Sequence, residues 1–202
     1  MSETSRQPLR FRFDAKKAAQ AAEALLTLSG GRRNYMELVK LLYLADREAL
    51  IQLDRPITGD RFVNLPYGPV LSRILNLIRG GPIDEGDAPW FDSVSPPTGY
   101  DVELVKKTGS DELSLAELGI LNETFSRYGR SDWKELSRLT HSLPEWVDPD
   151  GGQLPIVAEQ ILALGGRKIE EIQRIKEEAA ACESLDKELA TYRGQEFSAP
   201  SE

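Results

Sequence analysis

The stretch "YMELVKLLYLADREALIQL", residues 35–53, carries the clearest structural signal in the 202-residue chain. Its apolar residues recur at steps of three and four, which is the spacing of one face of an α-helix. Further apolar residues widen that face, so we expect a helix that is buried on most sides. The face and its flanks comprise Leu38, Leu41, Leu42, Ala45, Ala49, Met36, Val39 and Tyr43. Asn34 and Glu37 have the spacing of a capping box and predict where this helix begins.

Helical segments also flank this stretch on both sides. The tripeptide Tyr67-Gly68-Pro69 precedes an apolar run that ends at Ile78. Proline suits the first position of a helix, because its missing N–H would have no partner there in any case. We therefore expect Gly68 to be the N-cap of a helix and Pro69 its first residue. The other predicted helix starts are Asp14, Ser114 with Glu117, Asp132 with Glu135, and Pro155.

A strand is predicted at residues 100–104. Tyr100, Val102 and Leu104 alternate there with acidic residues, which is the two-residue repeat of a half-exposed strand. The segment "WFDSVS", residues 90–95, is its expected hairpin partner, joined through two prolines. We expect a small two-stranded ribbon on an otherwise helical body.

The last helix is predicted to be long and amphipathic, and to lie within residues 166–192. Its narrow apolar stripe comprises Ile169, Ile172, Ile175, Ala179, Cys182, Leu185 and Leu189. Such a helix is marginal in isolation, so it must pack on its own domain, on a second copy of the chain as a homodimer, or on a partner. The predicted fold class is mainly α. Its expected parts are a disordered N-terminus (1–13), a compact helical domain (14–165), this helix, and a disordered tail (193–202).

Composition narrows the classes of partner. The formal net charge is −8, and an acidic surface repels phosphate backbones, which weighs against nucleic acid as the main partner. The small basic clusters around Arg10 and Arg12 and around Arg32 and Arg33 are interpreted as solvated surface. Cys182 is the only cysteine, which excludes an internal disulfide and fits a reducing cytoplasm. No apolar run approaches the ~20 residues of a membrane span.

Catalytic signatures are scarce, and we expect no enzymatic activity, no cofactor and no metal. The chain has one histidine, His141, and no phosphate-binding glycine loop or G-x-S-x-G element. The simplest interpretation of His141 is a residue near a helix C-terminus, stabilised by the negative end of the helix dipole. An enzyme that uses His141 and a nearby acid is the weakest of three functional hypotheses.

Six segments in order resemble a known family. They are Lys40–Asp46 ("KLLYLAD"), Pro56–Asp60 ("PITGD"), Tyr67–Val70 ("YGPV"), Leu113–Glu117 ("LSLAE"), Tyr128–Gly129, and Leu136–Trp146 ("LSRLTHSLPEW"). In this order and spacing, residues 14–165 resemble the Panacea-domain family of SocA-like antitoxins, some of which are labelled phage-associated proteins. The resemblance implies a small intracellular protein that neutralises a toxin encoded by the adjacent gene.

The resemblance implies neutralisation by direct protein–protein binding, and in one branch an adaptor role that hands the toxin to a protease. The acidic balance of the chain suits a basic toxin. Two candidate contact regions follow: the rigid turn with its surroundings, and the C-terminal helix. Their residues are Thr58, Asp60, Tyr67, Gly68, Pro69 and His141, and Ile172, Ile175 and Leu185.

The alternative function is a DNA-binding transcriptional autoregulator. The first two helices, joined by "SGGRRN" at residues 29–34, have the arrangement of a helix-turn-helix. Arg32 and Arg33 then lie near the start of the second helix. The leucines of that helix are too apolar for a surface that faces a DNA groove.

Overall fold

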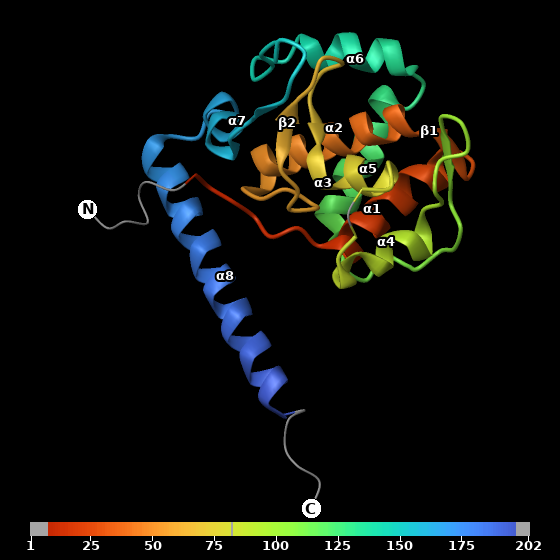
Figure 1. Ribbon diagram of the computed structural model, residues 1–202. Helices are drawn as coiled ribbons and strands as arrows, with labels where there is room; N and C mark the ends of the chain where they lie inside the picture. Colours follow the sequence, from red (N-terminus) through yellow and green to blue (C-terminus); the bar gives the residue numbers. More distant parts are fainter. Residues whose placement is uncertain (1–7, 82, 197–202) are drawn as a thin grey trace, which may run out of the picture.

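A computed structural model describes residues 8–81 and 83–196 and confirms a mainly helical fold with a long C-terminal helix (Figure 1). The helices of this part are α1 (Ala15–Leu28), α2 (Tyr35–Leu53), α3 (Ser72–Ile78), α4 (Ala88–Ser93), α5 (Leu115–Tyr128), α6 (Trp133–His141), α7 (Ala158–Leu164) and α8 (Ile169–Glu196). The short strands are β1 (Arg32–Asn34), β2 (Phe62–Asn64), β3 (Val70–Leu71), β4 (Asp101–Glu103) and β5 (Leu154–Pro155).

Helix α2 is the centre of the domain, as the opening stretch predicts. Helices α1, α3, α5, α6 and α7 and strand β3 all contact it (Figure 1). Every side chain from Leu38 to Asp46 is buried, so this part of the helix has no solvent face. Its polar residues are therefore enclosed together with its leucines, and each must find its partner inside the protein.

Three of the predicted helix starts are confirmed in atomic detail. Asp14 accepts a hydrogen bond from the Lys17 backbone N–H, and both Ser114 with Glu117 and Asp132 with Glu135 form reciprocal capping boxes. Asn34 caps α2 by accepting from the Met36 N–H at 2.9 Å. The reciprocal half predicted for Glu37 is wrong, because its carboxylate pairs with Arg33 at 3.2 Å instead.

The predicted helix start at Gly68 and Pro69 is wrong. The turn leads into β3, and α3 begins only at Ser72. The side chain that satisfies the start of α3 comes from Asp60, whose carboxylate accepts from the N–H groups of Arg73 at 2.9 Å and Ile74 at 2.8 Å. A distant carboxylate therefore replaces the local cap that the Gly-Pro pair suggested.

The two-stranded ribbon is confirmed, but its predicted pairing is wrong. Strand β4 pairs antiparallel with β1, placing Arg33 opposite Val102. The expected partner segment forms α4 instead, which buries Trp90, and only the bridge between Val94 and Leu104 remains of the expected hairpin. A second sheet, in the order β3-β2-β5, was not predicted. Pro155 lies in β5, so α7 begins three residues later than the expected start, at Ala158.

The described N-terminal segment lies against α7 and α8. The segment 8–13 runs between α8 and α1 (Figure 1). Its Leu9 is buried and donates its N–H to the Glu159 carboxylate. This described part of the segment expected to be disordered therefore packs on the domain. Gly59 permits the close approach, because a Cβ there would lie 2.0 Å from the carbonyl oxygen of Arg12.

The C-terminal helix begins on the domain and then projects away from it (Figure 1). Its described range reaches Glu196, four residues beyond the predicted end at 192. Residues 1–7 and 197–202, which belong to the termini expected to be disordered, lie outside the described residues. The division into domains at 14–165 and 166–192 stays a prediction. No helix in the described ranges is long and apolar enough to span a membrane.

The cap of α3 generates a stability prediction. Asp60→Ala removes the buried acceptor of the Arg73 and Ile74 N–H groups and should lower the free energy of unfolding by about 2 kcal/mol. Urea denaturation measures this loss. Arg61→Ala, at the exposed neighbouring position, is the control and should unfold at the wild-type midpoint. An unchanged midpoint for Asp60→Ala would contradict the role given to Asp60.

Candidate functional site

Two of the predicted contact residues, Thr58 and Asp60, lie inside the protein. Thr58 is 1% exposed, and its hydroxyl and backbone N–H both donate to the carboxylate of Asp46 on α2. Burial raises the pKa of Asp46 to about 7, against the opposing effect of these hydrogen bonds. Burial likewise raises the pKa of Asp60. The prediction that these two residues form a contact surface is wrong, because they hold the loop "PITGD" against α2.

The turn Tyr67-Gly68-Pro69 is fastened from below by Lys40. The Lys40 ammonium is 1% exposed and donates to the Pro69 carbonyl at 2.8 Å. Gly68 has φ +91°, and a Cβ there would lie 2.6 Å from the Thr140 hydroxyl and 2.8 Å from Lys40 Nζ. Glycine is therefore required both by the backbone conformation and by the close approach. Gly68 and Pro69 are buried, so they shape the turn and do not present a surface.

No described carboxylate forms an ion pair with Lys40. Desolvation consequently lowers the pKa of Lys40 to about 7. A strongly shifted lysine often marks a functional region, and here it lies directly beneath an exposed turn.

His141 lies against the inner side of the same turn. A hydrogen bond to the Pro66 backbone attaches its ring there, and the ring is 4.4 Å from that of Trp146. Burial lowers the pKa of His141, and the nearby charge of Lys40 adds to this effect. His141 therefore supports the turn from the interior, as a neutral imidazole at pH 7.

The loop after α6 is tied to the same central helix. The carboxylate of Glu145 accepts from the Tyr43 hydroxyl at 2.8 Å and pairs with the guanidinium of Arg47. The Glu145 carbonyl also accepts from the Asn64 side chain at 3.3 Å. Three of the segments that carried the resemblance, "KLLYLAD", "YGPV" and "LSRLTHSLPEW", thus bind one another through polar contacts of α2.

An aromatic pocket opens on the surface above this junction. We use this name for the cavity of about 410 Å³ lined by Asn34, Tyr35, Met36, Tyr67, Arg79, Tyr100 and Trp133. The rings of Tyr67 and Trp133 meet edge to face at 6.2 Å, and those of Tyr35 and Tyr100 are stacked at 6.3 Å. Tyr67 is 61% exposed and Tyr100 is 71% exposed.

The pocket is rigid although it is made from five separate segments. The Ser137 hydroxyl donates to the Tyr67 carbonyl at 2.8 Å, which holds the turn to α6. The Tyr35 N–H donates to the Tyr100 carbonyl at 2.8 Å, which joins the start of α2 to the segment before β4. Tyr67 is the one predicted contact residue that lines it. Sequence reasoning missed the other six, because only the fold brings them together.

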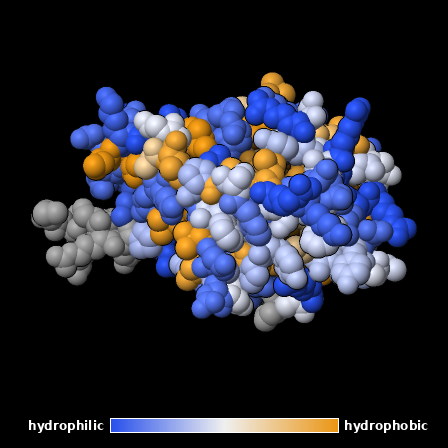
Figure 2. Space-filling model, turned by 90° about the horizontal axis from the view of Figure 1, so that it is seen from above, coloured by the Kyte–Doolittle hydropathy of each residue, from blue (hydrophilic) through white to orange (hydrophobic). Residues whose placement is uncertain are grey.

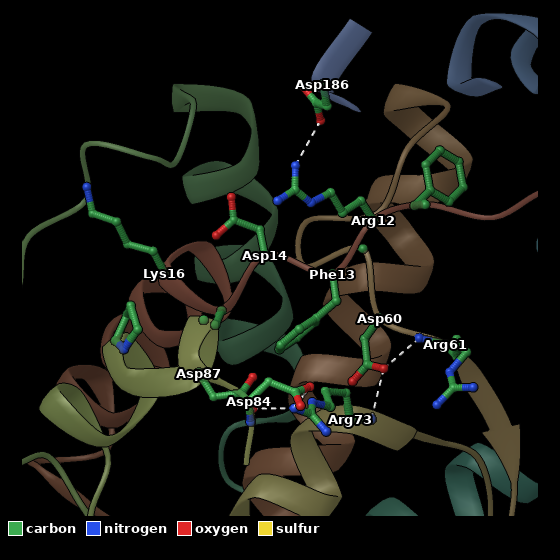
Figure 3. Close-up of a pocket in the computed structure, with 15 residues that line it drawn as sticks. Arg12, Phe13, Asp14, Lys16, Asp60, Arg61, Arg73, Asp84, Asp87 and Asp186 are labelled. Atoms are coloured by element: carbon green, nitrogen blue, oxygen red, sulfur yellow. Dashed lines mark hydrogen bonds and ion pairs between the residues drawn. The ribbon is translucent and has the colours of Figure 1, made fainter. Parts of the chain in front are cut away.

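A larger groove lies between the segment 8–13, α3, α4 and α8 (Figure 3). Five of its charged groups pair within it: Arg12 with Asp186 at 3.3 Å, and Arg73 with Asp84 and Asp87. Its lining contains no serine, cysteine or histidine, and no group of three or more potential metal ligands occurs among the described residues. The groove is a seam of ion pairs without the residues of a nucleophilic or metal site.

The structure contradicts the helix-turn-helix interpretation. The helix expected to face DNA is α2, which is enclosed by the domain. Arg33 is buried and donates to the Gly129 carbonyl at 2.9 Å, so its assignment to solvated surface was also wrong. Arg32 pairs with Asp101 at 2.8 Å. Arg33 is therefore not available for phosphates.

The predicted contact residues of α8 do not share one environment. Ile175 is buried and Ile172 is partly buried against the hydrophobic core, whereas Leu185 is exposed. The first turns of α8 therefore pack on their own domain. Of the three alternatives for this helix (its own domain, a second copy or a partner), the first holds for these turns. The distal half presents Leu185 and Leu189 to solvent, as the first residue of the helix does with Ile169.

The comparison with protein families gives one result. A family model described as "Antitoxin SocA-like, Panacea domain" matches residues 38–147, a range that contains all six segments of the resemblance. That description favours a non-enzymatic role and implies a toxin as partner in general. No match was found among curated proteins or among solved structures.

The buried lysine generates a pH prediction. Because the folded pKa of Lys40 is about 7 and the unfolded value is 10.5, the unfolded state binds the extra proton between these pH values. Wild-type stability should therefore rise with pH across this window. Lys40→Met should be more stable than wild type by about 1–4 kcal/mol at pH 6, and this difference should shrink towards pH 10. Chemical denaturation at several pH values measures it.

The control for this experiment is Lys134→Met, which changes the same residue type at an exposed position. Its stability difference from wild type should not depend on pH. A pH-independent difference for Lys40→Met would show that Lys40 titrates at its ordinary value and is not desolvated.

Proposed function

Because the chain belongs to the SocA-like, Panacea-domain antitoxin family, we propose that it neutralises a cognate toxin, encoded by the adjacent gene, by direct binding. We assign the aromatic pocket as the centre of the contact. The observation that carries this assignment is the exposure of Tyr67 and Tyr100 beside Trp133, on a part of the surface that is firmly held from within.

The composition of the pocket is that of an interface centre. Tyr, Trp, Met and Arg are enriched in the energetic centres of protein interfaces. On the face seen in Figure 2, hydrophobic residues form small groups separated by hydrophilic ones. A pocket that concentrates aromatic side chains offers a partner a large apolar area per residue.

Rigidity supports the same assignment. Lys40, Ser137 and His141 hold the turn that presents Tyr67, so little conformational entropy is lost when a partner binds.

Neutralisation then follows from occlusion: a helical body of this size covers the toxin surface around the anchored segment. Delivery to a protease is the alternative consequence of the same complex, and the lifetime of the toxin in cells distinguishes the two.

The distal half of α8 is the competing contact surface. Leu185 and Leu189 are exposed there, and a partner could accept them in a groove. If the aromatic pocket is the contact, substitutions in the pocket should weaken binding and substitutions on the distal half of α8 should not. If α8 is the contact, the reverse is expected.

The test is co-purification with the product of the adjacent gene, together with rescue of growth when that product is expressed. Tyr67→Ala and Trp133→Ala should each weaken the complex by about 2 kcal/mol, roughly thirtyfold in Kd, and reduce rescue. Tyr67 is exposed, so its substitution leaves the fold intact, which thermal unfolding verifies. Leu185→Asp is the matched control and should bind as wild type.

Full rescue by both pocket variants, with loss of rescue in Leu185→Asp, would move the interface to α8. A harmless neighbour that does not bind the wild-type chain would refute the antitoxin proposal itself.

A further inference from the structure

We infer that the partner segment entering the aromatic pocket is acidic, with a large apolar side chain beside one or more carboxylates; this inference rests on the proposed function. Three exposed cations, here called the cationic rim, lie on one side of the pocket or next to it: Arg79 in its lining, Lys134 beside the Trp133 ring, and Arg138 one turn further along α6. An apolar floor with a cationic rim is complementary to a segment of that composition.

The rim is placed by two helices. Arg79 follows the last residue of α3 and lines the pocket directly. On α6, the ammonium of Lys134 lies 5.6 Å from the centre of the Trp133 ring, and Arg138 follows one helical turn later on the same side. The rim thus extends from the wall of the pocket along the helix that carries its tryptophan.

The rim is free to pair with a partner. Among the described residues, none forms an ion pair with Arg79, Lys134 or Arg138. The rim therefore places unpaired cations beside one pocket of a chain whose net charge is −8. They attract carboxylates without having to break an existing pair.

Nearby carboxylates are already engaged. Asp132 and Glu135 form the capping box of α6, and Asp101 pairs with Arg32. They lower the local field, but their oxygens are held by backbone N–H groups and by a guanidinium. The charged groups at the pocket that have no ion-pair partner among the described residues are therefore cationic, opposite in sign to the net charge of the chain. The net charge alone favoured a basic toxin, whereas the contact segment that fits here is acidic.

A protein segment fits these observations better than a nucleic acid. Phosphates would also pair with the rim, and bases would stack on the rings. However, a nucleic acid strand continues beyond the pocket over a surface of net negative charge, whereas a short acidic segment of a protein does not.

The experiment compares two double charge reversals. R79E/R138E reverses the rim, and R55E/R61E reverses two exposed arginines without an ion pair among the described residues. Arg55 lies beyond the far end of α2, whose 19 residues span about 28 Å from the pocket side. Both variants change the net charge equally, so any difference between them reports location.

Association with the purified product of the adjacent gene is measured at 50 and 300 mM salt. These values lie below and above the physiological ionic strength of about 150 mM. R79E/R138E should slow association at least tenfold at low salt and remove most of its salt dependence. R55E/R61E should stay within about twofold of wild type. R79Q/R138Q should fall between R79E/R138E and wild type.

Each other outcome decides against a different claim. Loss of binding in Tyr67→Ala with unchanged or faster association of R79E/R138E would overturn the acidic segment and leave the proposed function intact. Unchanged binding in both would overturn the pocket as the interface. A labelled single-stranded oligonucleotide that binds wild type, but not R79E/R138E, would overturn the assignment of a protein segment.

Discussion

The structure depends on the polar groups that α2 carries into the interior. Asp46 must satisfy its carboxylate, and the loop of Thr58 supplies three donors for it. Lys40 must satisfy its ammonium, and the Pro69 carbonyl lies in reach. An unpaired buried polar group costs a large part of the stability of a domain, so these partners are strongly specified. Leucines alone would enclose α2 but would not decide which loop lies where.

This constraint is also what positions the candidate site. The Lys40 contact fixes the back of the turn, and α6 fixes its side through Ser137. Tyr67 is thereby held outward against Trp133 without contributing to the core itself. Burying the Lys40 ammonium without a carboxylate lowers the stability of the fold, but its contact with the turn makes the surface there rigid, and a binding site needs that rigidity. Lys40 therefore affects both the stability of the fold and the geometry of the candidate site.

Local patterns predicted most helices because their signals lie within a few residues: caps at Asp14, Ser114 and Asp132, and the apolar spacing of α2. The errors arose where a distant residue supplied the decisive contact. Asp60 caps α3 from 13 and 14 residues away in the sequence, so Gly68 and Pro69 were free to form a turn instead. Likewise β4 found β1 rather than the neighbouring segment. Tyr67 was the only lining residue of the pocket that the sequence predicted, because the other lining residues come from segments far apart in the chain.

The segments that carry the family resemblance and the residues that line the pocket are largely different sets. Lys40, Asp46, Thr58 and Glu145 belong to the former and point inward. Of the pocket residues only Tyr67 lies within a quoted segment, while those that set its charge and most of its aromatic area, such as Arg79, Tyr100 and Trp133, lie outside. The segments of the family resemblance therefore specify a scaffold with a rigid turn, and the pocket residues around this turn specify which partner it binds. Such a division lets one fold accommodate partners of unrelated structure, because changes at the pocket leave the buried polar contacts of α2 untouched.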